Sequence, residues 1–390
     1  MSVMQERIYL DNAATTPIDP RVLEAMLPYL TEHFANPSSV HQPGQHARGA
    51  VDDARAAISR CIGARSSEII FTSGGTESNN LAIRGFAEAN AAHGRHMVTC
   101  NIEHPAVREA VEDLGSRGFE VSTVPVTPDG VVRAEDIVSA VRSDTILVSL
   151  MLVNNEIGTI QPVAEVGAFV RGLAATGRKI ALHTDAVQAV GKIPVDVENL
   201  GCDLLSLSGH KIHAPKGVGA LYVRKGVRIT KQNLGGGQES KLRGGTENVA
   251  GIVALGKAAE LAGDSLESAL RDVTELRDLF EDSMRRICPR ALFNGSGAER
   301  VPYISNITFP DSEAEQILIG LDMRGVSVST GSACSSGSIS ASPVILALGH
   351  STETARGAIR FSFSRLNETD DLDTIVGFFK NLESGASDSN

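Results

Sequence analysis

Cysteine is scarce in this 390-residue chain, which has five, at positions 61, 100, 202, 288 and 334. They lie far apart, and no two form a Cys-x-x-Cys pair. The spacing excludes a disulfide framework and a zinc or iron–sulfur site built within the chain, so no metal site is expected. If one of these cysteines has a chemical role, we expect it to act alone.

Long apolar runs and an excess of positive charge are also lacking. No 18-residue apolar stretch occurs, so no segment is expected to span a membrane. The N-terminal sequence MSVMQERIYLDN has no apolar signal segment, which predicts a cytoplasmic protein. The 36 Lys and Arg residues face 47 Asp and Glu residues, giving a net charge of −11. This balance argues against a protein that wraps nucleic acid.

What the chain does have is an alternation of short apolar runs with amphipathic stretches, which is typical of βαβ units and a largely parallel sheet. Strands are expected at 68–72, 96–101, 146–152, 179–184, 204–208 and 219–223, with helices at 45–61 and 79–92. A continuous helical pattern from 248 to about 287 precedes two further strands at 305–309 and 358–362. The sequence thus predicts an α/β fold with a large domain at 16–262. Residues 1–15 and 263–390 are expected to form a smaller α+β domain.

Polar residues follow several of these strands, where ligands bind in open parallel sheets. The first strand leads into Ser73, Gly74, Gly75 and Thr76 and then a helix. Glycines allow close backbone approach, and a helix N-terminus attracts anions, so this turn is a candidate phosphate cup. The alternative is an ordinary glycine turn in which Thr76 caps the helix.

Other strand ends offer one polar candidate each. His104 follows the second strand, Asn155 follows the run 146–152, and Asp185 ends the next strand, with Gln188 three residues on. Each has a plain alternative: a lone His is more often a surface or capping residue, Asn155 could close a turn, and a solitary Asp usually caps a helix.

Lys211 comes directly after the apolar strand 204–208, following Gly209 and His210. An enclosed lysine loses its charge readily, and its free amine can then form an imine with a carbonyl. Most lysines are solvated, so the position alone is weak evidence.

Taken together, a phosphate cup, a carboxylate and an imine-forming lysine match pyridoxal 5′-phosphate, with Asp185 on the pyridinium nitrogen. No G-x-G-x-x-G or G-x-x-x-x-G-K-[ST] element follows a strand, which weakens nucleotide binding as the rival.

At these residues the sequence resembles cysteine desulfurases of the NifS/IscS type, among the class V, fold-type I pyridoxal phosphate enzymes. The matching segments run in family order over residues 8–365 and include YLDNAATTPID, FTSGGTESNN, VNNEIGTIQP, HTDAVQAVGK, SLSGHKIHAPKGVGALYVRKG, RGGTENVAGIV and STGSACSSGS. The lysine segment together with the GSAC loop is highly specific.

The resemblance implies roles around the cofactor ring. Lys211 would carry the cofactor aldehyde as an imine and move the substrate Cα proton. His104 would stack on the ring and serve in acid–base steps. Asp185 would pair with the ring nitrogen, and Gln188 would lie beside the phenolic oxygen.

It also implies a shared phosphate site. Thr76, Ser208 and His210 would bind the phosphate, with Gly75 contributing its backbone. Thr246 of RGGTEN would reach the phosphate of the neighbouring subunit, which implies a homodimer.

For the substrate, the resemblance assigns Asn155 and Arg360 to the carboxylate of L-cysteine and Cys334 to nucleophilic attack on its sulfur. The products would be L-alanine and a persulfide on Cys334. The sulfur would then pass to an acceptor such as a U-type scaffold protein, most directly for iron–sulfur cluster assembly. The tail after Arg360 is shorter than the tail with which housekeeping members dock the scaffold, so docking in that way is not expected.

Two other readings stay open at this point. One is another class V enzyme, a selenocysteine lyase or a small-amino-acid aminotransferase, although the GSAC loop argues against the aminotransferase. The other is a catalytically silent sulfur-transfer partner that keeps the fold as a binding scaffold. Joint presence of Lys211, Asp185, His104 and Arg360 argues against it.

Overall fold

The structure is a computed structural model that describes residues 7–310, 312–331 and 341–384. Its strands are β1 (Ile8–Tyr9), β2 (Ile69–Thr72), β3 (His96–Cys100), β4 (Glu120–Val124), β5 (Thr145–Ser149), β6 (Ala181–Asp185), β7 (Leu204–Ser208), β8 (Gly219–Val223), β9 (Leu292–Phe293), β10 (Ile304–Thr308), β11 (Val326–Ser327) and β12 (Ala358–Ser362).

Its helices are α1 (Pro20–Met26), α2 (Pro28–Thr31), α3 (Gln42–Cys61), α4 (Gly75–Asn90), α5 (Pro105–Ser116), α6 (Ala134–Ala140), α7 (Val163–Ala175), α8 (Val197–Leu200), α9 (Val249–Asp264), α10 (Leu266–Ile287), α11 (Ala314–Asp322), α12 (Pro343–Ala347), α13 (Thr352–Ala355) and α14 (Asp371–Glu383). Short 3₁₀ turns are η1 (Ser66–Glu68), η2 (Gly209–Lys211) and η3 (Glu239–Lys241).

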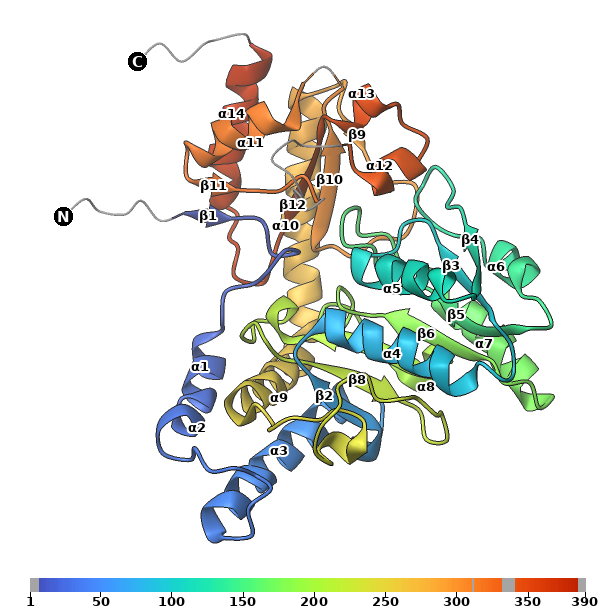
Figure 1. Ribbon diagram of the computed structural model, residues 1–390. Helices are drawn as coiled ribbons and strands as arrows, with labels where there is room; N and C mark the ends of the chain where they lie inside the picture. The colour runs from blue at the N-terminus through green and yellow to red at the C-terminus, as the bar shows by residue number, and fades with distance from the viewer. Residues whose placement is uncertain (1–6, 311, 332–340, 385–390) are drawn as a thin grey trace.

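A seven-stranded sheet forms the centre of the larger part of the molecule, with strand order β2-β8-β7-β6-β5-β3-β4 (Figure 1). Neighbouring strands are parallel except at β8, which is antiparallel to both β2 and β7. The predicted α/β fold with a mostly parallel sheet is confirmed.

Helices cover both faces of this sheet, so its strands other than β4 are buried along their whole length. Successive strand side chains point to opposite faces. Ile70 therefore joins the core formed with α4 and α5, while Ile69 and Phe71 join the core formed with α3, α7 and α9. Figure 1 shows α4 and α5 crossing one face of the strands. The sheet is thereby held rigid beneath the loops at its edges.

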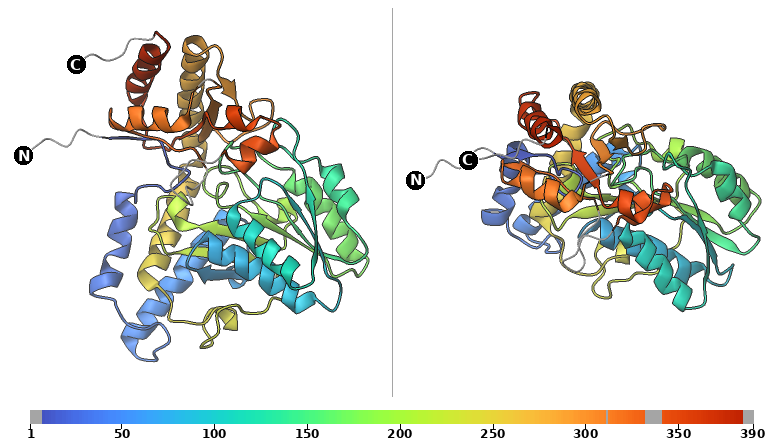
Figure 2. Two further views of the ribbon diagram at one scale, coloured as in Figure 1. Left: turned by 45° about the horizontal axis from the view of Figure 1, so that its top comes forward. Right: turned by 90° about the horizontal axis from the view of Figure 1, so that it is seen from above.

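A smaller part is built around α10 and the antiparallel sheet β12-β10-β9 (Figure 2). Its core is aromatic: Phe280 lies 4.8 Å from Phe361 and 5.6 Å from Phe363, measured between ring centroids. Leu10 belongs to the same core, so the N-terminal segment packs here before it enters the large part. The domain limits at 16–262 stay a prediction.

One expectation about the elements was wrong, and strand β4 was missed. The helical pattern from 248 to 287 is not one helix, because α9 ends at Asp264 and α10 begins at Leu266. At the break, the hydroxyl of Ser265 donates to the carbonyl of Leu261 at 2.7 Å, a local bond that competes with helix propagation. Strand β4 was not foreseen, because it is a mostly half-exposed strand at the sheet edge.

Substitution of Gly219 tests how closely β8 packs against the turn after β2. A Cβ at this position would lie 2.7 Å from Gly74 Cα and 2.7 Å from the Leu207 carbonyl oxygen, so backbone would have to move. We expect Gly219→Ala to lower the free energy of unfolding by about 1–3 kcal/mol. Gly172 in α7 has no neighbour within 4 Å of an added Cβ. Gly172→Ala should therefore stabilise the protein by roughly 0.5–1 kcal/mol. Equal effects of the two substitutions in thermal and urea unfolding would contradict this account.

Candidate functional site

A cavity of about 360 Å³ opens where polar loops leave the large sheet. All of the predicted site residues except Thr246 and Cys334 line it: Gly75, Thr76, His104, Asn155, Asp185, Gln188, Ser208, His210, Lys211 and Arg360. The wall is completed by Ala13, Ala14, Asn79, Met151, Val153, Val187, Ser329 and Gly331. Residues from distant parts of the chain therefore meet in one site.

The topology of the sheet explains why these residues lie close together. Strands β3, β5, β6 and β7 are parallel neighbours, so their carboxyl ends lie at one edge. His104, Asp185 and Lys211 each stand at or just beyond such an end. Arg360 comes instead from β12 of the small sheet, so the cavity lies between the two parts of the molecule.

The turn from β2 into α4 forms one end of the cavity. Gly74 is the N-cap of α4, with φ of +150°, a conformation open to glycine alone. The alternative in which Thr76 caps the helix is thus wrong. Gly75 is pressed against the neighbouring loop, because a Cβ there would lie 2.8 Å from Val187 Cγ2. The first backbone N–H groups of α4 have no partner within the helix, so this end of the cavity suits an anion.

Asp185 is the buried acid of the site. The side chain of Asn79 donates to its Oδ2 at 2.7 Å, and the backbone N–H of Val187 donates to its Oδ1 at 3.0 Å. These two bonds fix the carboxylate and leave lone pairs for a cationic N–H. Asn79 was missed by the sequence reasoning, although it lies in the FTSGGTESNN segment.

Lys211 lies in η2, and its Nζ donates to the carbonyl oxygens of Ala13 and Ala14, each at 2.6 Å. Burial is the main cause that lowers the pKa of this amine to about 8, and the positive charge of Arg360 acts in the same direction. Asp11 and Asp185 oppose the shift. Near neutral pH, an appreciable fraction of the amine is therefore uncharged and nucleophilic.

Two histidines flank the lysine and are held neutral. His104 is the N-cap of α5, and its Nδ1 accepts from the backbone N–H of Ala106 at 3.1 Å. The capping interpretation is thus correct, but the ring also lines the cavity, with Nε2 as its second nitrogen. Burial lowers the pKa of His104, and burial together with Lys211 lowers the pKa of His210 to about 4.

Arg360 is only 3% exposed and is anchored on two sides. It donates to the carboxylate of Asp11 and to the backbone carbonyl of Asn155, both at 2.8 Å. Its Nε is buried without a hydrogen-bond partner in the part of the chain that the structure describes. Such a guanidinium is well placed to take a carboxylate ligand. Asp11 was not foreseen.

Among the described residues, Thr246 is the predicted site residue that does not line the cavity. Thr246 is exposed. Cys334 lies outside the described residues. The chain enters that segment from Ser329 and Gly331, which do line the cavity.

The other cysteines fit the expected structural roles. Cys100, Cys202 and Cys288 are buried and Cys61 is half-buried. Burial raises the pKa of Cys61 and Cys100 and raises the pKa of Cys202 and Cys288 to about 12. Their thiolates, the reactive form, are therefore scarce at neutral pH.

Within residues 7–310, 312–331 and 341–384, no group of three or more His, Cys, Asp or Glu side chains could hold a metal ion. No helix in these ranges is long and apolar enough to cross a membrane.

The lowered pKa of Lys211 predicts its reactivity. In the cofactor-free protein, acetylation of Lys211 by a trace of acetic anhydride should rise with pH and reach half of its maximum near pH 8, because only the neutral amine reacts. The unfolded chain is the control, since an ordinary lysine titrates at about 10.4. Peptide mass spectrometry gives the labelling at each pH. Identical profiles in folded and unfolded protein would contradict the lowered pKa.

Comparisons with known proteins agree with this geometry. The family model described as "Aminotransferase class-V" matches residues 8–375. The chain is 48% identical over 379 residues to a protein of Dictyoglomus turgidum named cysteine desulfurase IscS, covering 97% of this chain and 95% of that protein. A solved structure of a "NifS-like protein" superposes with a TM-score of 0.90 at 37% identity, covering 97% of this chain and 100% of the other. Another, "SspA in complex with cysteine", has a TM-score of 0.81 at 35% identity, covering 93% and 100%. The chain belongs to the class-V aminotransferase family.

Proposed function

We propose that this protein is a cysteine desulfurase that uses pyridoxal 5′-phosphate. In the net reaction, L-cysteine and the thiol of Cys334 give L-alanine and a persulfide on Cys334. The substrate C–S bond and the S–H bond of the Cys334 thiol break, a C–H bond and an S–S bond form, and the sulfur is oxidised as the carbon is reduced. The observation that carries the proposal is the cavity that joins the low-pKa amine of Lys211 to Asp185 and Arg360.

The cavity residues suit pyridoxal phosphate. The α4 N-terminus and the side chains of Thr76, Ser208 and His210 form a set of donors for a phosphate. Gly75 lies beside them, at a position where a Cβ would collide with Val187. Lys211 offers an amine to an aldehyde, and Asp185 offers a fixed carboxylate to a ring N–H. When bound, pyridoxal phosphate supplies an electron sink for negative charge at the substrate Cα.

The chain's own groups would perform the remaining work. The guanidinium of Arg360 and the side chain of Asn155 would hold the substrate carboxylate, with Arg360 preoriented by Asp11. The neutral amine of Lys211 would take the proton from the substrate Cα. His104 would use Nε2 for proton transfer, because its Nδ1 is occupied by the Ala106 N–H.

Cys334 is the proposed sulfur acceptor within the chain. It follows Gly331 by three residues, and three residues of chain span at most about 11 Å, so the chain length allows its thiol to approach the cavity. The raised thiol pKa values of the other cysteines argue against each of them. We further propose that the persulfide sulfur passes to a scaffold protein for iron–sulfur cluster assembly, as the resemblance to the NifS/IscS type implies.

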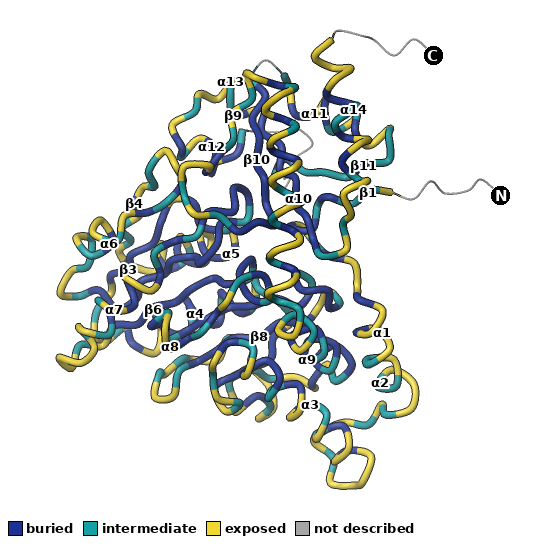
Figure 3. The backbone as a smooth tube through the Cα atoms, turned by 180° about the vertical axis from the view of Figure 1, so that it is seen from behind, coloured by how far each residue is buried: buried dark blue, intermediate teal, exposed yellow. Residues whose placement is uncertain are grey.

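We also propose that the enzyme is a homodimer with shared sites. Large apolar side chains are exposed on α1, on α2 and on the segment that leads to α3, where Figure 3 shows a largely exposed backbone. They are Leu23, Leu27, Leu30, Phe34 and Val40. An exposed apolar cluster of this kind favours a protein partner, and a second copy is the most economical one.

The function is tested by alanine release from L-cysteine. Lys211→Ala should abolish release, and Cys334→Ser should abolish persulfide formation while the protein still binds pyridoxal phosphate. Cys61→Ser, the matched control, should remain active because Cys61 is half-buried with a raised pKa. Full activity of Lys211→Ala would overturn the proposal.

Three outcomes would point to the alternative functions. Faster turnover of selenocysteine than of cysteine would indicate a selenocysteine lyase, and transamination without sulfur release would indicate an aminotransferase. A colourless protein that takes up no pyridoxal phosphate would indicate a silent scaffold.

Shared sites predict complementation between two defective variants. Lys211→Ala and Thr246→Ala homodimers should both have little activity at a cofactor concentration that leaves the Thr246→Ala protein mostly empty. After unfolding and refolding together, about a quarter of the wild-type activity should return, because half of the dimers are mixed and each has one intact site. No recovery would mean that Thr246 serves its own subunit or that no dimer forms.

A further inference from the structure

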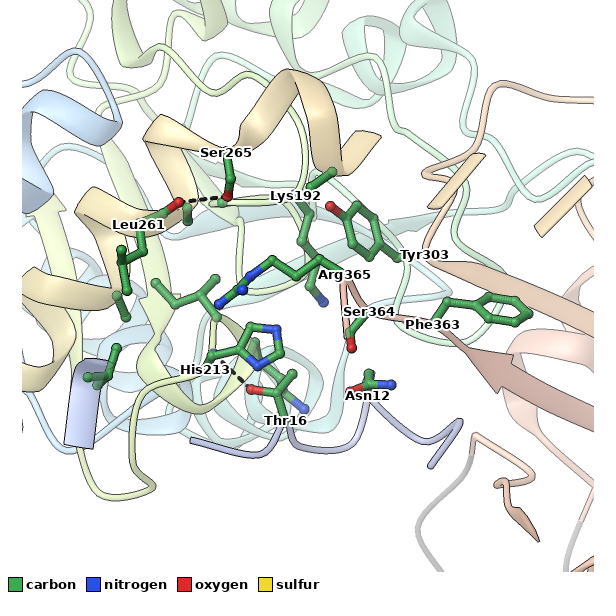
Figure 4. A pocket seen from close by; sticks show the side chains of 17 residues that line it. Asn12, Thr16, Lys192, His213, Leu261, Ser265, Tyr303, Phe363, Ser364 and Arg365 are labelled. Atoms are coloured by element: carbon green, nitrogen blue, oxygen red, sulfur yellow. Dashed lines mark hydrogen bonds between the residues drawn. The ribbon is translucent and has the colours of Figure 1, made fainter. Parts of the chain in front are cut away.

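Lys192 is a buried lysine for which the proposed reaction has no use. It follows β6 by seven residues, and its side chain is almost fully enclosed, with 6% of the residue exposed. It does not line the cavity that holds Lys211 and Asp185. It lines a second, smaller cavity of about 30 Å³ on the other side of Lys211, which itself contacts both. Figure 4 shows Lys192 there with Arg365 and His213.

In the part of the chain that the structure describes, the one hydrogen bond of the Lys192 side chain joins it to a residue of the proposed active site. Its Nζ donates to Oε1 of Gln188 at 2.6 Å. On the other side of the same amide, Nε2 of Gln188 donates to the carbonyl oxygen of Ala13 at 2.9 Å. That carbonyl also accepts from Nζ of Lys211. A short network thus connects Lys192 through Gln188 and Ala13 to Lys211.

This network determines which way the Gln188 amide faces. A lysine has donors and, when charged, no acceptor, so the amide oxygen must face Lys192. The amide nitrogen is thereby directed to the side of Ala13 and Lys211. Without Lys192, the amide oxygen would be buried without its partner, and only the Ala13 carbonyl would hold the amide in this orientation.

Burial of Lys192 costs free energy that the fold does not recover through an ion pair. Among the described residues, no carboxylate lies within ion-pair distance of Lys192. Burial, together with repulsion from Lys211 and Arg360, lowers its pKa to about 7. The other charged or titratable groups around its cavity are His213, Tyr303 and Arg365. A residue kept in such surroundings is a candidate for function rather than for stability.

We propose that Lys192 is a positioning residue that holds the Gln188 amide with its N–H groups toward the cofactor. The inference rests on the proposed function, in which Gln188 lies beside the phenolic oxygen of pyridoxal phosphate. An N–H donor at that oxygen favours its deprotonated form, whereas a carbonyl oxygen there would disfavour it. Lys192 acts on the cofactor only through Gln188 and touches no substrate.

The test uses the resting holoenzyme without substrate and follows the visible absorption of the bound cofactor as a function of pH. Lys192→Met should raise the midpoint of this titration by about half a pH unit or more, the shift expected for one ordinary hydrogen bond. Gln188→Met should also raise it. Because Lys192 acts through Gln188, adding Lys192→Met to Gln188→Met should change the midpoint by less than half of the single shift.

Three controls separate this role from a structural one. Lys192→Met removes a buried charge but leaves the Gln188 amide oxygen unpaired, and cooperative thermal unfolding of the cofactor-free variant should show that it still folds. Lys192→Arg retains donors and charge and should restore the midpoint toward the wild-type value. Lys179→Met, at an exposed lysine, should leave the midpoint unchanged.

Two results would overturn the inference. An unchanged midpoint in Lys192→Met shows that Lys192 has no influence on the cofactor. An undiminished shift in the double variant shows that its charge acts directly and not through Gln188. If the wild-type protein takes up no pyridoxal phosphate, the proposed function fails as well. The two results above contradict only the role of Lys192.

Discussion

Enclosure of the Lys211 amine is the constraint on which the rest of the site depends. A solvated lysine is charged at neutral pH, and burial at the edge of the sheet, together with the charge of Arg360, brings the pKa of Lys211 down to about 8. The enclosure is completed by the N-terminal segment, whose Ala13 and Ala14 carbonyls accept from the amine. That segment is held in turn by bonds to Ser362 of β12, so the small sheet helps to close the site built on the large one.

Burial also affects the reactivity of the cysteines. Burial makes Cys100, Cys202 and Cys288 poor nucleophiles and leaves them as packing residues. Ser329 and Gly331 line the cavity and come just before Cys334 in the sequence. These three cysteines therefore serve as packing residues, and we assign the chemistry to Cys334.

Much of the fold and site was predictable from the sequence, for identifiable reasons. The strands at 204–208, 219–223 and 358–362 are short, mainly apolar runs that are buried along their whole length, and the structure has them with the same limits. The half-exposed strand β4 and the break at Ser265 have no such signal. The site residues came from strand ends and from family segments. Asn79 and Asp11 were missed because their partners, Asp185 and Arg360, are distant in sequence. Lys192 was missed because its neighbours in the sequence do not reveal that it is buried.

The central claim is that sulfur leaves L-cysteine in this cavity and arrives on Cys334. The most direct measurement is a single turnover with sulfur-labelled L-cysteine at limiting substrate, followed by peptide mass spectrometry under conditions that preserve persulfides. We predict one added labelled sulfur on the peptide of Cys334 and one L-alanine released for each. Labelled sulfur on another cysteine, or alanine formed while the Cys334 peptide remains unmodified, would contradict the account.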